Sequence, residues 1–282
     1  MIVMSSQLYP WVIAALAVLV VVGAGCTALS QPTTPPAPGT DPEAAALLIH
    51  LQSDITRALE AMDSHLAYAA FDLGKTDLDD NAARGILVNL SGTHPSIVDC
   101  TASDTNGTIV VAEPAAYHGT EGADIQGQPN VRHILATKRP IMSEVITVAE
   151  GFPAAVISAP IFTNENRFVG FSSIVFRPYD LIAGIVGPAT TGTSRQVMVI
   201  QTDGRVLYDT DPTQVGRLTF EDPLYADYPD LLDVAHRVAD ERYGTATYGF
   251  AADDGEAVQK KIAWTTTGLH GTEWRVAVIT EI

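Results

Sequence analysis

The feature that most constrains the fold is an internal repeat, in which one order of elements occurs twice in the body of the chain. Residues 97–102 and 197–201 are rich in apolar and β-branched side chains and predict strands. Each strand is followed by a hairpin signal, Asn106-Gly107 in the first half and Asp203-Gly204 in the second. A chain that repeats its elements in this way is expected to fold into two similar modules.

The repeat continues with a helix and three strands in each half. Helical patterns cover residues 129–137 and 228–242, each after a loop that contains Gly and Pro. Three strands follow in each half, within residues 140–179 and at residues 244–251, 257–266 and 272–279. Trp264 and Trp274 are the core candidates of the second half. A short helix over residues 179–186, ending at Gly187-Pro188, is expected to join the halves.

A long helix is predicted before the repeat, over residues 41–74. Asp41 and the following Pro42 are a typical helix start, and Gly74 is a typical C-cap. Apolar residues recur at helical spacing between these ends, at Leu48, Ile55, Leu59, Met62, Leu66, Ala69 and Leu73. Such a helix spans roughly 45–50 Å, which is more than the width of one small module. Two interpretations stay open, a coiled-coil helix that forms a homodimer and a spine on which two modules pack.

The first forty residues predict export and attachment to a membrane. Residues 1–25 contain a mostly apolar segment that ends in small residues, which is typical of a signal peptide. Cys26 follows these small residues as in a lipobox, so we expect it to carry a lipid, although an uncleaved membrane anchor is the alternative. Residues 26–40 are rich in Pro and Thr and predict a tether. The expected location is the cell membrane, on its extracytoplasmic face.

Charge and the absence of chemical motifs exclude several classes of function. The net charge of −17 disfavours nucleic acid as a partner. The seven His residues form no metal-ligand pattern, and no phosphate loop, dinucleotide fingerprint or nucleophile elbow occurs. We therefore expect no enzyme activity, no metal and no cofactor. Because no transducing domain follows Ile282, a separate transducer or transport permease is expected to read any signal.

The order of elements, found twice behind one long helix, resembles the double Cache family of extracytoplasmic sensor domains. The residues that carry the resemblance are Asp104 to Gly107, Ser158 to Ile161, Val169 to Phe171, Asp203-Gly204, Tyr208-Asp209 and Gly216. The resemblance covers about residues 42–280. It implies an α+β fold, with a long N-terminal helix followed by two PAS-like (Cache) modules, each an antiparallel sheet flanked by helices.

The predicted domain boundaries follow from this reading. Residues 41–92 hold the long helix and a second, shorter helix, residues 93–187 form the membrane-distal module, and residues 188–282 form the membrane-proximal module. The resemblance also implies that the ligand is held in the distal module, between the sheet of residues 140–179 and the loop and helix before it. The candidate ligand-binding residues there are Arg132, Arg139, Tyr117, Ser143 and Ser173. Arg132 leads because a guanidinium in an apolar cleft can bind a carboxylate through two hydrogen bonds.

The predicted ligand is a small carboxylate or a neutral solute. Family members that bind amino acids carry Arg-x-Trp-Tyr in this helix and an Asp on the last strand of the module. Here the helix reads Arg132-His133-Ile134-Leu135, and Val175 or Ser173 stands near the position of that Asp. An α-amino acid is therefore less expected. The predicted function is a sensor or solute-binding protein, and the alternative is a structural or adhesion-type surface protein without a small ligand.

Overall fold

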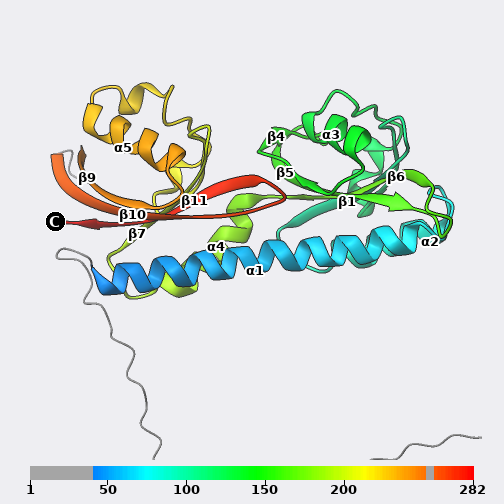
Figure 1. The fold of residues 1–282 in the computed structure, drawn as a ribbon, viewed down its shortest axis with the longest axis horizontal. Coiled ribbons are helices and arrows are strands. Elements are labelled where there is room, and N and C mark those ends of the chain that lie inside the picture. Colours follow the sequence, from blue (N-terminus) through cyan, green and yellow to red (C-terminus); the bar gives the residue numbers. More distant parts are fainter. Residues whose placement is uncertain (1–40, 252–256) are drawn as a thin grey trace, which may run out of the picture. The chain divides into compact units, whose positions relative to one another are not determined.

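The computed structural model describes residues 41–251 and 257–282. In this part of the chain one long helix lies along two antiparallel sheets, and each sheet carries a further helix on its other face (Figure 1). The predicted α+β fold class is thus confirmed. The predicted signal peptide, the tether and Cys26 lie outside the described residues.

The long helix α1 (Pro42–Leu73) has the ends that its sequence predicts. The Asp41 carboxylate accepts hydrogen bonds from the backbone N–H groups of Glu43 and Ala44, at 3.0 and 3.2 Å. Gly74 caps the C-terminus in a right-handed conformation with φ −65°. Its lack of a side chain serves close packing, because a Cβ there would lie 2.0 Å from the carbonyl oxygen of Phe162.

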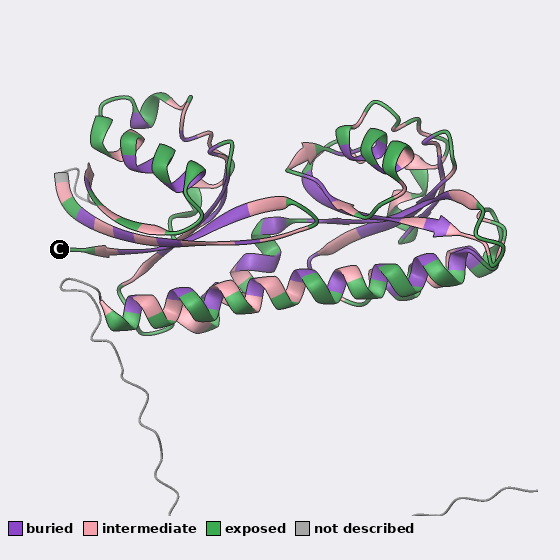
Figure 2. Ribbon diagram, in the orientation of Figure 1, coloured by how far each residue is buried: buried purple, intermediate pink, exposed green. Residues whose placement is uncertain are grey.

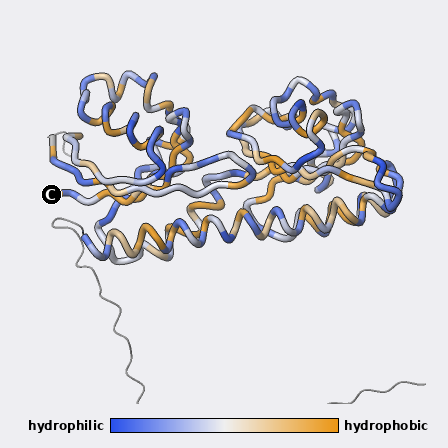
Figure 3. The backbone as a smooth tube through the Cα atoms, in the orientation of Figure 1, coloured by the Kyte–Doolittle hydropathy of each residue, from blue (hydrophilic) through white to orange (hydrophobic). Residues whose placement is uncertain are grey.

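The apolar stripe of α1 is buried against both sheets. Its buried members are Ala44, Leu48, Leu51, Ile55, Leu59, Met62, Leu66, Ala69, Ala70 and Leu73. They pack on strands of the first sheet and of the second, and they belong to one cluster of buried side chains that joins both modules. Figures 2 and 3 show the buried, apolar side of α1 facing the sheets and its polar side facing outward. The stripe is therefore used within the chain, as the spine interpretation requires.

The first sheet has the strand order β2-β1-β6-β5-β3, with β4 paired to β5. Its strands are β1 (Ile97–Ser103), β2 (Ile109–Glu113), β3 (Ile141–Met142), β4 (Ile146–Thr147), β5 (Pro153–Phe162) and β6 (Phe168–Phe176). The first of the three strands predicted within residues 140–179 is not one strand. The structure divides it into β3 and β4, each paired with β5.

The second sheet repeats this plan with the order β8-β7-β11-β10-β9. Its strands are β7 (Gln196–Gln201), β8 (Val206–Asp209), β9 (Gly244–Ala251), β10 (Ala257–Leu269) and β11 (Thr272–Glu281). Trp264 and Trp274 are 1% and 0% exposed, so both core predictions are confirmed. The two hairpins of the repeat turn at equivalent glycines, Gly107 with φ 84° and Gly204 with φ 87°, a backbone conformation that glycine adopts without strain.

Shorter helices complete the modules. They are α2 (Asn81–Ser91), η1 (Ala115–Thr120), α3 (Pro129–Thr137), α4 (Pro178–Thr190), η2 (Pro212–Gln214), η3 (Pro223–Tyr225) and α5 (Pro229–Asp240). The predicted end of the joining helix at Gly187-Pro188 is wrong, because α4 continues through Pro188 to Thr190. Among the described helices, none has the combination of length and apolar character that a membrane span needs.

The two modules contact each other directly as well as through α1. The backbone N–H of Val145 donates to the side-chain carbonyl of Gln201 at 2.6 Å, and the Thr272 hydroxyl donates to the carbonyl of Met142 at 2.5 Å. Phe176 and Trp274 pack with their ring centroids 6.3 Å apart. The segment between α3 and β5 of the first module therefore touches the second sheet.

Candidate ligand-binding sites

One face of the first sheet is apolar and the other carries a buried polar band. Along β1, Cys100 and Ala102 belong to the core on the α1 side. Because side chains alternate along a strand, Asp99, Thr101 and Ser103 lie on the opposite face of the sheet, the face that carries α3 (Figure 1). All three are buried, with exposed fractions of 0 to 3%. Buried polar groups need hydrogen-bond partners, so the polar side chains of this face require donors or acceptors from the segments that cover it or from a ligand.

The polar band continues across the neighbouring strands. Thr101 lies beside Ser173 of β6, and Ser173 lies beside Ser158 of β5. The hydroxyls of Ser158 and Ser173 share a hydrogen bond of 2.8 Å. These two hydroxyls therefore satisfy each other, whereas the β1 end of the band depends on other partners.

A cavity of about 20 Å³ lies between this band and the segments that cover it. Polar residues from four segments line it, namely Thr101 of β1, Ser173 of β6, Asn130 of α3 and Glu150 of the turn after β4. A space of this size holds about one water molecule. The side-chain carbonyl of Asn130 is buried and receives no hydrogen bond from the described residues.

Buried Asp99 and half-buried Glu150 form an acidic pair, of which Glu150 lines this cavity. No described N–H or hydroxyl group donates to either oxygen of Asp99 or to Oε2 of Glu150. Burial, followed by repulsion from Glu150, raises the pKa of Asp99 to about 9. Asp99 is therefore protonated at neutral pH, and its proton can be donated to Glu150. Apart from this shared proton, no described group donates to the buried oxygens of the pair.

The predicted site residues are not brought together. Arg132 is exposed and its guanidinium donates to the carbonyl of Gly127. Arg139 is also exposed, and Tyr117 is half-buried on η1. Ser143 is buried, but its hydroxyl accepts a 2.9 Å hydrogen bond from the backbone N–H of Val156.

Among the five predicted residues, Ser173 is the one that lines the first-module cavity. Val175, which stands near the position of the Asp of amino-acid-binding members, lines it too, whereas Thr101, Asn130 and Glu150 were not among the predicted site residues. Asp99 had a visible signal, since a charged residue stands inside the apolar strand Ile97–Ser103.

An acidic side chain lies next to the strand position where the sequence offers no acid for an ammonium group. Position 175 is a valine, but Asp99 is the cross-strand neighbour of Val175 in the β1–β6 register. A carboxyl group therefore lies beside the expected position, supplied by the adjacent strand. The prediction against an α-amino acid therefore stays a prediction, with an acidic residue next to the position where none was expected.

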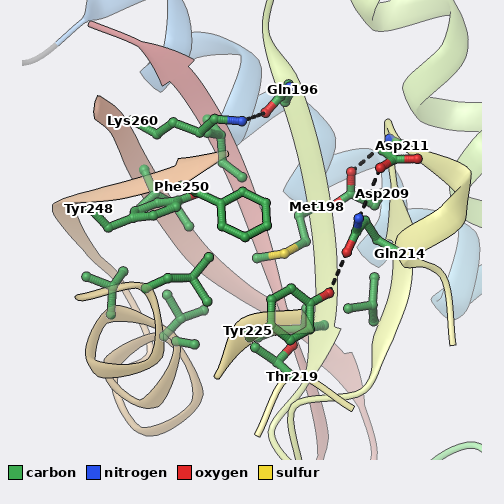
Figure 4. A pocket seen from close by; sticks show the side chains of 18 of the residues that line it. Gln196, Met198, Asp209, Asp211, Gln214, Thr219, Tyr225, Tyr248, Phe250 and Lys260 are labelled. Atoms are coloured by element: carbon green, nitrogen blue, oxygen red, sulfur yellow. Dashed lines mark hydrogen bonds between the residues drawn. The ribbon is translucent and has the colours of Figure 1, made fainter. Parts of the chain in front are cut away.

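A larger cavity, of about 410 Å³, lies in the second module (Figure 4). Its floor is the face of the second sheet that points away from α1, and α5 together with the η2 and η3 segments covers it. Apolar side chains form most of the wall, including Met198, Ile200, Val234, Phe250 and Ile262. The volume lies within the range of small-molecule sites, which is roughly 300–1,000 Å³.

Charged side chains of both signs line the second-module cavity. The Lys260 ammonium donates to the side-chain carbonyl of Gln196 at 3.1 Å. Asp209 accepts a 2.8 Å hydrogen bond from the backbone N–H of Asp211. Burial raises the pKa of Asp209 to about 6, so this carboxyl is mostly ionised at neutral pH.

Comparison with known proteins identifies the fold. Residues 57–178 match the HK/GC/Chemotaxis protein-like sensor domain family, a range that ends just after β6. No curated protein matches the chain. An extracellular ligand binding receptor from Desulfohalobium retbaense is 26% identical over 85% of this chain, with a TM-score of 0.73. The chain spans 40% of the length of that receptor.

Solved chemoreceptor domains have the same fold at lower identity. The ligand-binding domain of the Pseudomonas aeruginosa amino acid chemoreceptor PctB, in complex with L-Gln, is 14% identical with a TM-score of 0.60, over 86% of this chain and 91% of that one. The ligand-binding domain of the Pseudomonas fluorescens chemoreceptor CtaA, in complex with L-isoleucine, is 14% identical with a TM-score of 0.59, over 85% and 92%. The double Cache fold of the described residues follows from these likenesses.

Proposed function

We propose that this chain is the ligand-binding part of an extracytoplasmic, membrane-anchored sensor or solute-binding protein. In this proposal a small solute binds in the first module and a separate membrane partner, a transducer or a transport permease, reads the bound state. The observation that carries the proposal is the set of buried acceptor oxygens on Asp99, Asn130 and Glu150 that no described donor satisfies. Asn130 and Glu150 line a cavity inside the range that matches a sensor domain family, and Asp99 lies next to Glu150.

The same atoms define the kind of solute. Carboxyl and amide oxygens accept hydrogen bonds, so the ligand should carry donors, either on a neutral group or on an ammonium. A small carboxylate, the other expected class, offers acceptors and no donor, so it would leave these oxygens unsatisfied. Because the cavity of about 20 Å³ is smaller than such a solute, binding requires α3 and the loop before it to move away from the sheet.

The direct contacts between the modules support transmission of a conformational change from the first module to the second. β3 follows α3 closely in the chain, and Met142 of β3 accepts the hydrogen bond from Thr272 of β11. A displacement of α3 would thus move β3 and change its contact with the second sheet. The relative from Desulfohalobium retbaense is likewise named as an extracellular ligand binding receptor.

Thermal unfolding against a library of small solutes tests the binding function. A ligand at 100 times its Kd adds about 2.7 kcal/mol, which corresponds to a rise in Tm of about 5–10 °C for a domain of this size. Asn130→Ala should abolish the shift, whereas the exposed Asp79→Asn should retain it. If no solute in a broad library raises the Tm, a structural or adhesion-type protein becomes the better description.

Membrane attachment through Cys26 is part of the proposal. Mass spectrometry of protein extracted from membranes should find Cys26 as a lipid-modified N-terminus, because a lipobox-like segment precedes it. An intact Met1 would instead support an uncleaved anchor.

A further inference from the structure

The cavity of the second module lies outside the range that matches a sensor domain family, which ends at residue 178. It is about 410 Å³ in volume, compared with about 20 Å³ in the first module. It needs no opening movement to hold a small molecule. The chemistry of its wall, considered independently of the first module, specifies what kind of molecule fits.

Lys260 supplies a buried positive charge, which opposes part of the rise that burial causes in the pKa of Asp209, but it donates no hydrogen bond to a described carboxylate. Lys260 is 6% exposed. The nearest described carboxylate oxygen, on Glu281, is 3.8 Å away, beyond hydrogen-bond distance, and Glu281 is 58% exposed. The close partner is the neutral amide of Gln196. Among the described residues, one of its three N–H donors has an acceptor at hydrogen-bond distance. A buried ammonium is normally paired with an anion, so an anionic acceptor in the cavity would complete its partners.

The acidic side chains of the wall limit how much negative charge a ligand can carry. The carboxylate of Asp211 is occupied by Thr213 and Gln214, and Gln214 in turn accepts a 2.5 Å hydrogen bond from the Tyr225 hydroxyl (Figure 4). Asp209 retains acceptor capacity beyond its one bond to the backbone of Asp211. A second carboxylate on the ligand would meet these acids, so one negative charge is favoured and two are not.

The rest of the wall requires an apolar body. α5 contributes Leu231, Val234 and Val238, and the sheet contributes Met198, Ile200 and Ile262. Removing apolar surface from water is favourable, so a hydrocarbon body would be bound favourably between α5 and the sheet.

We propose that the second module is a binding site for a monocarboxylic acid with an apolar body, whose carboxylate pairs with Lys260 and whose body lies between α5 and the sheet. This site is separate from the proposed site of the first module. The carboxylate expected from the sequence is thus assigned to a different module and a different cation from Arg132.

Isothermal titration with hexanoate, hexylamine, hexanol and adipate tests the site, because these probes share an apolar chain and differ in charge. Hexanoate should bind more tightly than the other three. Lys260→Met should weaken hexanoate binding about 10- to 100-fold, the loss expected for a charge-assisted hydrogen bond. Lys261→Met is the matched control, because this neighbour on β10 lies on the opposite face of the strand and should bind hexanoate normally.

Two further variants keep the test decisive. Lys260→Arg retains the charge and should retain binding, which separates loss of the anchor from misfolding. Asp99→Asn changes the first module and should leave hexanoate binding unchanged, so failure of the first-module proposal would not affect this one. The proposal is overturned if hexylamine or hexanol binds as tightly as hexanoate, if Lys260→Met binds hexanoate normally, or if hexanoate shows no saturation at about 10 mM.

Discussion

Replacement of Arg275 by Met is expected to reduce the free energy of unfolding by about 3–5 kcal/mol, the loss typical of breaking a buried, hydrogen-bonded charge. Arg275 of β11 is 3% exposed. Its Nε donates to the carbonyl of Val238 at 3.1 Å, and its Nη2 donates to that of Ala239 at 3.0 Å. Its Nη1 donates to Glu273 at 2.9 Å.

These contacts explain the size of the effect. The last carbonyls of a helix have no donor within the helix, and Val238 and Ala239 lie in the last turn of α5 (Pro229–Asp240). Arg275 thus caps α5 with a positive charge at the negative end of its dipole. Met fills similar space but donates no hydrogen bond, so the carbonyls would be left unsatisfied.

Chemical denaturation of Arg275→Met and of Arg237→Met measures the difference. Arg237 lies on α5, is 47% exposed and pairs with Glu241 at 3.1 Å, so its loss should cost about 0.5 kcal/mol or less. A loss below about 1 kcal/mol for Arg275→Met would mean that water satisfies the carbonyls of α5. The hydrogen bonds from Arg275 would then contribute little to holding α5 over the second-module cavity.

Asp99→Asn is expected to remove much of the pH dependence of stability in the first module. The folded pKa of Asp99 is about 9 and its reference value is 3.8, so the folded state binds the proton more tightly than the unfolded state. Stability from this group is therefore fully present below about pH 4 and is lost as the pH rises toward 9. The loss for one proton is at most about 1.4 kcal/mol per pH unit.

Asn cannot ionise, and its amide can still donate to Glu150. The variant should therefore gain stability relative to the parent as the pH increases, when both are unfolded by urea at about pH 5, 7 and 9. The exposed Asp79→Asn is the control and should follow the parent. Parallel curves for Asp99→Asn and the parent would contradict the raised pKa.

Much of the fold could be predicted because its signals are local. Helix α3 (Pro129–Thr137) has the predicted bounds, and α1 (Pro42–Leu73) begins and ends where its caps indicate. The order of strands and helices was readable because hairpin turns and helical periods depend on neighbouring residues. The continuation of α4 through Pro188 was not predicted. Pro is compatible with a helix when packing holds the remainder of the helix, here through the buried Leu181, Ile182 and Val186.

The candidate sites were less predictable because they depend on residues that are distant in sequence. Arg132 has the residue type of a ligand anchor, but its position on α3 leaves it exposed. Asp99 and Val175 are far apart in the chain, and only the register between β1 and β6 makes them neighbours. Lys260 reads as one of two adjacent lysines in a strand, and strand alternation alone does not say which face is covered by α5.

The sequence by itself therefore determined the order of elements, the long helix with its apolar stripe and the division into two modules, because periodicity, caps and turns are properties of contiguous residues. The tertiary structure alone decided which polar side chains are buried, which carboxyl groups meet, and that the larger cavity lies in the second module. Those features depend on which faces of the sheets are covered by α3 and α5, and burial by distant segments is what turns an ordinary Asp or Lys into a group that requires a partner.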